Sequence, residues 1–262
     1  MNEKAHSTPL EQWISAWLQH QRALGRSYDH TEWILKQLRN FLVTTNNADL
    51  DQASFDLWCQ SLSNLSATTR RGRQLIVRKF CRYRQRTEPD CFVPDPLHFA
   101  RMLPYRRPVI VEPEQVARLL VAAGRLVATS NSPLLPEVMR MAVILLYTAG
   151  LRRGELVRLT LGDVDAKTGL LRVRSSKFHK SRLVPLSLDA SDAVRVYLRQ
   201  RLATPFDSAA CAPLLCCGAC GHHGYSGTGL GQAINRLFVA ADVKDSEGRR
   251  PRVHDIRHSF AV

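Results

Sequence analysis

The 262-residue sequence lacks the features of a membrane-spanning or exported protein. It contains no uninterrupted run of eighteen apolar residues, which is the length needed to cross a bilayer. The polar N-terminus, Met1 to Leu10, has no apolar signal-peptide core. Its 7 cysteines, an odd number, fit a reducing compartment better than a disulfide framework. We therefore expect a cytoplasmic protein.

Acidic residues are scarce as well. Asp and Glu number 23 against 37 Lys and Arg, which gives a formal net charge of +14 and a pI near 10.0. Such a surface attracts polyanions, and nucleic acid is the commonest of them. Because hydrophobic residues make up 45% of the chain, it can still bury a core, and its length suits one large domain or two ordinary ones.

The first third of the sequence predicts four amphipathic helices. Thr8-Pro9-Leu10-Glu11 is typical of a helix start, and Gly25 is a plausible end. A second helix is expected from about Ser27, a third around Trp58 and a fourth after Ser66. The apolar residues at helical spacing are Trp13, Ile14, Trp17, Leu18; Ile34, Leu38, Phe41, Leu42; Phe55, Trp58, Leu62; and Leu75, Ile76, Phe80, Tyr83.

The predicted fourth helix is strongly basic and contains no acid. A solvated helix face is the competing interpretation, but such a face usually mixes both signs of charge. We therefore predict a phosphate-facing helix. The candidate DNA-binding residues are Arg70, Arg71, Arg73, Arg78 and Arg82.

Prolines dominate the segment from Thr87 to Pro113, where six of them disfavour regular structure. Arg101, Arg106 and Arg107 keep this segment basic. It reads as an extended linker with a domain boundary near Tyr105, which gives domains over residues 1–104 and 105–262.

The second domain is expected to be rich in helices around a small sheet. A helix starts at Pro113, and residues 138–148 are apolar almost all round, as in a buried central helix. Alternating runs at 171–174 and 183–186 predict an antiparallel β-hairpin, and further helices are expected at about 189–201 and 229–241. The fold class is therefore mainly α with a small antiparallel β-sheet.

Three short segments carry residues suited to phosphate chemistry. Arg152 follows the helix-ending Gly150, so its planar, permanently charged fork can point into a cleft, and Glu155 can orient it. Lys177 lies at the predicted hairpin tip, where an ammonium can protonate a leaving alkoxide. His254 and Arg257 share one helix face at i, i+3 spacing and can grip one anion. Each segment taken alone is weak.

The order of these segments resembles the tyrosine recombinase family, also called the phage-integrase type. The resemblance runs from about Leu10 to Val262 and is carried by YTAGLRRGEL (147–156), KFHKSRLVPL (177–186) and HDIRHSF (254–260). It implies an N-terminal helical (SAM-like) DNA-binding domain followed by a catalytic domain, closing together around duplex DNA. It also implies site-specific recombination of mobile DNA through a 3′-phosphotyrosyl intermediate, with self-association into a tetrameric synapse on DNA.

The resemblance assigns roles residue by residue. Arg152 and Arg257 would hold the scissile phosphate, Lys177 would act as general acid for the leaving 5′-hydroxyl, and His254 would assist proton transfer. Glu155 would support Arg152. The family uses no metal or other cofactor, since cationic side chains stabilise the charge.

One element of the family pattern is missing. After the H-x-x-R box the family continues to a nucleophilic tyrosine, but none of the eight residues after His254 is tyrosine. We therefore expect the chain as written to hold the phosphate clamp without the nucleophile, as a C-terminally truncated member. A catalytically inactive, DNA-binding relative is one alternative. An unrelated metal-dependent nuclease or RNA binder is another, although no carboxylate cluster accompanies the basic motifs.

A cysteine- and histidine-rich segment could in principle bind metal. Cys217-x-x-Cys220 has metal-knuckle spacing, and Cys216, His222 and His223 lie beside it. No second pair that would close a zinc site is evident, so no metal is assigned.

Overall fold

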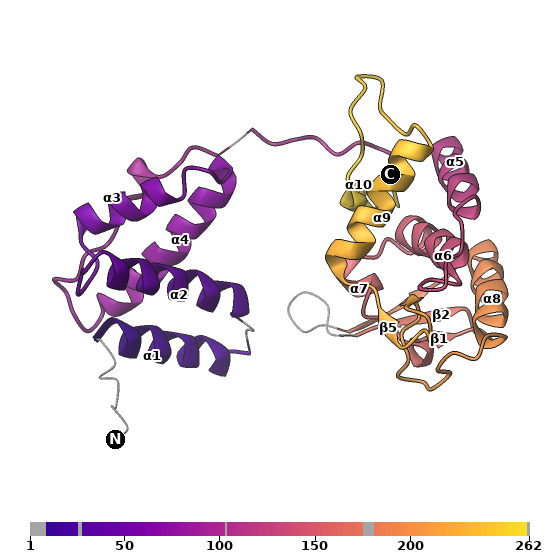
Figure 1. Cartoon of the computed structure of the whole chain (residues 1–262), viewed down its shortest axis with the longest axis horizontal. Coiled ribbons are helices and arrows are strands. Elements are labelled where there is room, and N and C mark those ends of the chain that lie inside the picture. The colour runs from indigo at the N-terminus through magenta and orange to yellow at the C-terminus, as the bar shows by residue number, and fades with distance from the viewer. Residues whose placement is uncertain (1–8, 26–27, 103, 175–180, 261–262) are drawn as a thin grey trace. The chain divides into compact units, whose positions relative to one another are not determined.

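The computed structural model describes residues 9–25, 28–102, 104–174 and 181–260 of the chain. The chain divides into two compact units, Met1–Tyr105 and Arg106–Val262 (Figure 1). We call them unit 1 and unit 2 and describe each by itself.

Unit 1 is built from helices. They are α1 (Pro9–Ala23), α2 (Asp29–Thr44), α3 (Gln52–Ser61), α4 (Ala67–Arg84) and the short 3-10 helix η1 (Pro96–His98). Thr8, the first residue of the predicted helix start, lies outside the described residues. Asp51 caps α3 by accepting from the Ser54 backbone N–H, and Ser66 caps α4 by accepting from that of Thr69.

The core of unit 1 follows from the helical spacing of apolar residues. On α2, Ile34, Leu35 and Leu38 are buried, because they recur on one face of the helix. The indole of Trp17 on α1 contacts the ring of Phe80 on α4, with ring centroids 5.8 Å apart.

Part of the predicted linker packs on unit 1. Phe99 is buried in its core, although it lies in the proline-rich segment that we expected to be extended. Arg71 and Arg78 of α4 hold this segment, because they donate to the carbonyls of Ala100 and Pro94. A proline-rich segment can still be ordered when side chains from a neighbouring helix bind its carbonyl groups.

Unit 2 combines helices with two small antiparallel sheets. The helical elements are α5 (Pro113–Gly124), α6 (Leu135–Thr148), α7 (Arg153–Leu156), η2 (Leu161–Asp163), α8 (Leu188–Leu202), α9 (Gly227–Ala240) and α10 (Val253–Phe260). The strands are β1 (Val164–Asp165), β2 (Leu170–Val173), β3 (Arg182–Pro185), β4 (Cys216–Cys217) and β5 (His223–Gly224). The mainly α fold with a small antiparallel sheet is confirmed.

The predicted hairpin is formed by β2 and β3, with Leu171 opposite Val184 and Val173 opposite Arg182. Strand β1 pairs with the other edge of β2, so the order is β1-β2-β3. Strands β4 and β5 form a separate two-stranded ladder within the cysteine- and histidine-rich segment.

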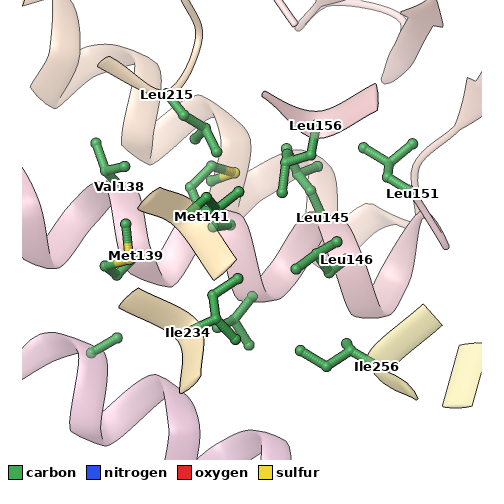
Figure 2. Close-up of a cluster of buried hydrophobic side chains, with 14 of the residues drawn as sticks. Val138, Met139, Met141, Leu145, Leu146, Leu151, Leu156, Leu215, Ile234 and Ile256 are labelled. Atoms are coloured by element: carbon green, nitrogen blue, oxygen red, sulfur yellow. The ribbon is translucent and has the colours of Figure 1, made fainter. Parts of the chain in front are cut away.

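Helix α6 is the centre of unit 2, as its apolar sequence predicts. Figure 2 shows Met141, Leu145 and Leu146 of α6 gathered with Ile234 of α9 and Ile256 of α10. Burying one such side chain contributes about 1.5–3 kcal/mol to stability. The packing matters for function because α6 ends directly before Arg152, while α10 carries His254 and Arg257. In the described part of the chain, no helix is long and apolar enough to cross a membrane.

Candidate active site

The turn after α6 requires glycine. Gly150 has a φ of +54°, in the left-handed region that side chains disfavour. A Cβ at this position would lie 2.4 Å from Cδ1 of Phe260, so the last residue of α10 packs directly on the turn. Arg152 follows in an extended conformation (φ −72°, ψ 146°) at the N-cap of α7. The backbone therefore turns sharply and presents Arg152 beside α10.

Glu155 fixes the position of Arg152. The side chain of Glu155 is only 2% exposed, and its Oε1 accepts a hydrogen bond from Nη1 of Arg152 at 2.8 Å. Its Oε2 accepts from the Arg152 backbone N–H at 2.9 Å. One buried carboxylate thus holds both the main chain and the guanidinium of Arg152. This contact agrees with the supporting role that the sequence suggested for Glu155.

Arg182 binds the same carboxylate, and our sequence interpretation did not single it out. Its Nη1 lies 3.0 Å from Oε1 of Glu155 and its Nη2 lies 2.9 Å from Oε2, a bidentate pair. Arg182 is the first residue of β3 and pairs with Val173, at the loop end of the hairpin. The sequence placed Arg182 in the hairpin segment, but only the packed structure shows that its guanidinium meets Glu155. Glu155 therefore connects the hairpin to the turn of Arg152.

Arg257 completes the cluster from α10. Its Nη1 donates to the carbonyl of Gly150 and lies 3.8 Å from Oε2 of Glu155. Burial lowers the pKa of Arg257, and the positive charges of Arg152 and Arg182 lower it further. Three guanidiniums surround one carboxylate, so these four side chains carry a net charge of +2 (three minus one). Such a cluster favours an incoming anion.

His254 lies one helical turn before Arg257. Desolvation lowers the pKa of His254, and the neighbouring His258, Arg257 and Arg152 lower it further. The rings of His254 and His258 meet edge to face, with centroids 4.8 Å apart. His254 and Arg152 both line a hollow of about 630 Å³. A lowered pKa keeps the imidazole neutral near pH 7, so it can accept a proton.

The remaining predicted residues are not part of the described cluster. Lys177 lies outside the described residues. Arg70, Arg71, Arg73, Arg78 and Arg82 lie on α4 of unit 1, where Arg82 is exposed and the other four are half-buried.

The cysteine-rich segment forms β4 and the turn to β5. Burial raises the pKa of Cys216 and that of Cys217, which disfavours the thiolate forms that bind metals. In the part of the chain that the structure describes, no group of three or more His, Cys, Asp or Glu side chains converges as metal ligands would.

The comparisons with known proteins identify the family, and solved structures share the fold. The phage integrase family matches residues 111–262. A putative integrase/recombinase of Sinorhizobium fredii, y4rB, is 31% identical over 265 residues, covering 97% of this chain and 81% of the relative. The chain therefore belongs to the phage integrase family of tyrosine recombinases, a class of DNA-binding proteins of DNA recombination and integration. The resemblance inferred from the three motifs is confirmed at this level.

Solved structures share the fold. The integrase of transposon Tn1549, in complex with transposon right end DNA, aligns with a TM-score of 0.66 at 17% identity, over 96% of this chain and 84% of that one. A lambda integrase dimer bound to a COC′ core site aligns with a TM-score of 0.63 at 15% identity, over 96% and 88%.

Proposed function

We propose that the site of unit 2 grips a phosphodiester of duplex DNA for strand cleavage and rejoining. The observation that carries this proposal is the convergence of Arg152, Arg182 and Arg257 on the buried Glu155, with His254 beside them. A phosphate spreads its charge over several oxygens, and guanidinium forks match that geometry.

The roles follow from the chemistry of each group. Arg152 and Arg257 hold the scissile phosphate and neutralise the charge that develops on it. A tyrosine oxygen attacks phosphorus while the bond from phosphorus to the 5′ oxygen breaks, which leaves a 3′-phosphotyrosyl link. Lys177 delivers the proton that the 5′ oxygen needs, and His254 assists proton transfer. Glu155 holds the arginines in place.

The residue that would act as the nucleophile is not identified among the tyrosines of the sequence. None of the 6 tyrosines in the sequence follows His254. The hydroxyl of Tyr197 is buried and donates to the carbonyl of Leu214 at 2.5 Å, so it cannot attack a phosphate. Burial raises the pKa of the Tyr225 hydroxyl, which disfavours the phenolate that would attack phosphorus. We infer that the 262-residue chain binds DNA without becoming covalently joined to it. The second candidate function is a DNA-binding accessory that occupies sites or pairs with an active partner.

A denaturing gel with an end-labelled suicide DNA substrate tests the proposal. The chain as written is expected to give no protein-linked band, because positioning cannot replace an attacking group. A chain extended by a family-type C-terminal segment with its tyrosine should give a band that protease removes. The same extended chain with Arg152→Ala is the matched control and should give none.

Two outcomes would contradict this reading. A protease-sensitive band from the chain as written would show that another tyrosine attacks. No band from an extended chain that is folded and binds DNA would favour the accessory function. Self-association on DNA, as in a tetrameric synapse, belongs to the same proposal, and sedimentation of the protein with and without duplex measures it.

A further inference from the structure

A second hollow of unit 2, here called the α6–α8 hollow, lies between these two helices. Its volume is about 390 Å³, within the range of small-ligand pockets, and it shares no lining residue with the hollow beside His254. Figure 1 shows α8 beside α6, and the last residue of α5, Gly124, lines the hollow as well. Much of the lining is apolar and comes from Pro136, Met141, Ile144, Ala193 and Val196. The proposed function uses none of these residues.

Glu137 contributes the one carboxylate among the residues that line the α6–α8 hollow. Its side chain has no ion-pair or hydrogen-bond partner among the described residues, and its Oε2 is enclosed. A polar group withdrawn from water without a partner costs free energy, so such groups are normally hydrogen-bonded in native proteins. Glu155 of the same unit shows the contrast, because Arg152 and Arg182 hold its buried carboxylate. Glu137 therefore has the capacity to pair with a cation that the described residues do not supply.

Arg140 is the cation in the lining of the hollow, but it is bound elsewhere. Glu137 and Arg140 lie at i, i+3 spacing on α6, at which side chains of opposite charge can pair. Nη1 of Arg140 instead donates to the carbonyl of Leu120 at 3.2 Å, in the last turns of α5, where the helix dipole attracts positive charge. A Cβ at Gly124 would lie 3.3 Å from this Nη1, so glycine leaves the space that the guanidinium occupies. The carbonyl end of α5 thus partly offsets the charge of Arg140, and Glu137 remains unpaired in the lining.

We propose that the α6–α8 hollow binds one organic cation, an alkylammonium or alkylguanidinium, whose charged end pairs with Glu137. The apolar lining takes the carbon chain of this ligand, because burying the chain removes apolar surface from water. Hydrogen bonds from an ammonium or guanidinium to a carboxylate are stronger than those between neutral groups. An anion gains nothing from Glu137, so the ligand class excludes phosphates and nucleic acid. The proposal goes beyond the proposed function, since it does not involve DNA.

The methionines of the chain provide the readout for binding of a probe, n-hexylammonium. The sequence holds 4 methionines, and Met141 lines the hollow, whereas Met102 of unit 1 is 68% exposed. NMR of protein with isotope-labelled methionine methyl groups therefore follows the hollow directly. Titration with the probe should shift the methyl signal of Met141 and leave that of Met102 unchanged. The expected Kd is on the order of 1–10 mM, because a ligand this small makes few contacts.

Glu137→Gln separates the charge pairing from the apolar contact. It should weaken hexylammonium binding roughly tenfold, about 1.4 kcal/mol, because a charge-assisted hydrogen bond is lost. The uncharged n-hexanol has the same carbon chain, so its affinity should be equal for the wild type and for Glu137→Gln. Glu114→Gln is the matched control, since it removes an exposed carboxylate at the start of α5 that does not line the hollow. It should leave both affinities unchanged.

A second variant and two further ligands identify what the hollow takes. Ala193→Leu places additional side-chain volume in the lining and should weaken the binding of hexylammonium and of hexanol alike. Spermidine represents a free polyamine, and a capped pentapeptide with arginine between leucines represents a protein segment. Tighter binding of spermidine would assign the hollow to a free amine, whereas tighter binding of the pentapeptide would assign it to an arginine of a protein partner.

Several results would overturn the organic-cation site. A Met141 methyl signal that does not respond to hexylammonium would show that the hollow takes no such ligand. Equal hexylammonium affinity of the wild type and Glu137→Gln would show that the carboxylate does not pair with the cation. Hexanol that binds as tightly as hexylammonium would reduce the hollow to an apolar cavity. The gel with the suicide DNA substrate tests the proposed function separately, so the failure of either proposal leaves the other standing.

Discussion

Glu155→Gln removes the charge that holds the arginine cluster together. Glu155 makes charge-assisted hydrogen bonds with Arg152 and Arg182, and glutamine has one acceptor oxygen and an N–H₂ group that faces the guanidiniums unfavourably. Leaving a buried charge unpaired costs about 3–5 kcal/mol. The side chains of Arg152 and Arg182 are 40% and 35% exposed, so water compensates part of the loss. We expect unit 2 to lose about 2–3 kcal/mol of unfolding free energy.

The assay uses the distribution of tryptophan. All 4 tryptophans lie in unit 1, at positions 13, 17, 33 and 58. Urea unfolding followed by tryptophan emission therefore reports unit 1, while far-UV circular dichroism reports both units. Glu155→Gln should shift the dichroism transition of unit 2 and leave the emission transition unchanged.

Glu137→Gln is the control for removing a carboxylate from the same unit. The Oε2 of Glu137 is enclosed and has no hydrogen-bond partner among the described residues, so this substitution should be neutral or stabilising. Equal effects of the two substitutions, or a shift of the emission transition in Glu155→Gln, would refute the account of Glu155 as the centre of the cluster.

Two further substitutions test the surroundings of the clamp. His258→Asn should raise the pKa of His254, measured by proton NMR titration, because a like charge is removed; desolvation should still keep it below about 6.5. As pH falls, the His254 imidazole of the unfolded chain binds a proton before that of the native chain does. The native state therefore loses stability on acidification between about pH 6.5 and the lowered pKa of His254. A native pKa of His254 above 6.5 would contradict desolvation as the cause. Gly150→Ala combines an unfavourable φ with a collision against Phe260, and should destabilise unit 2 by about 2–4 kcal/mol; an unchanged dichroism transition would show that α10 does not depend on this contact.

Local sequence patterns predicted much of the fold. The spacing of apolar residues located α2 and α6, and alternation located β2 and β3, because these signals come from residues close together in the chain. The hydrogen bonds from Arg71 and Arg78 to carbonyl groups of the segment around Phe99 were not predicted, because they join residues far apart in sequence.

The same reason limits what the sequence shows of the site. Motif order singled out Arg152, Glu155 and Arg257, and the structure brings them together. Arg182 was not recognised as a partner of Glu155, because a lone arginine on a strand has no local signature and Glu155 lies 27 residues away in the chain. Periodicity predicts elements, whereas contacts between elements require the three-dimensional packing.

The packing of α10 on Gly150 has a consequence for motion. Arg257 reaches the Gly150 carbonyl across 107 residues of chain, and α10 is a helix of 8 residues. A short helix can open locally at a lower free-energy cost than the whole domain. Such an opening would separate Arg257 from Arg152 while α6 stays folded. The arginine cluster would then be lost while the rest of unit 2 remains native. Native-state hydrogen exchange would reveal it as amides of residues 253–260 that exchange earlier than those of α6. An anion bound between the arginines should slow that exchange selectively, so occupancy of the site and order of α10 would rise together.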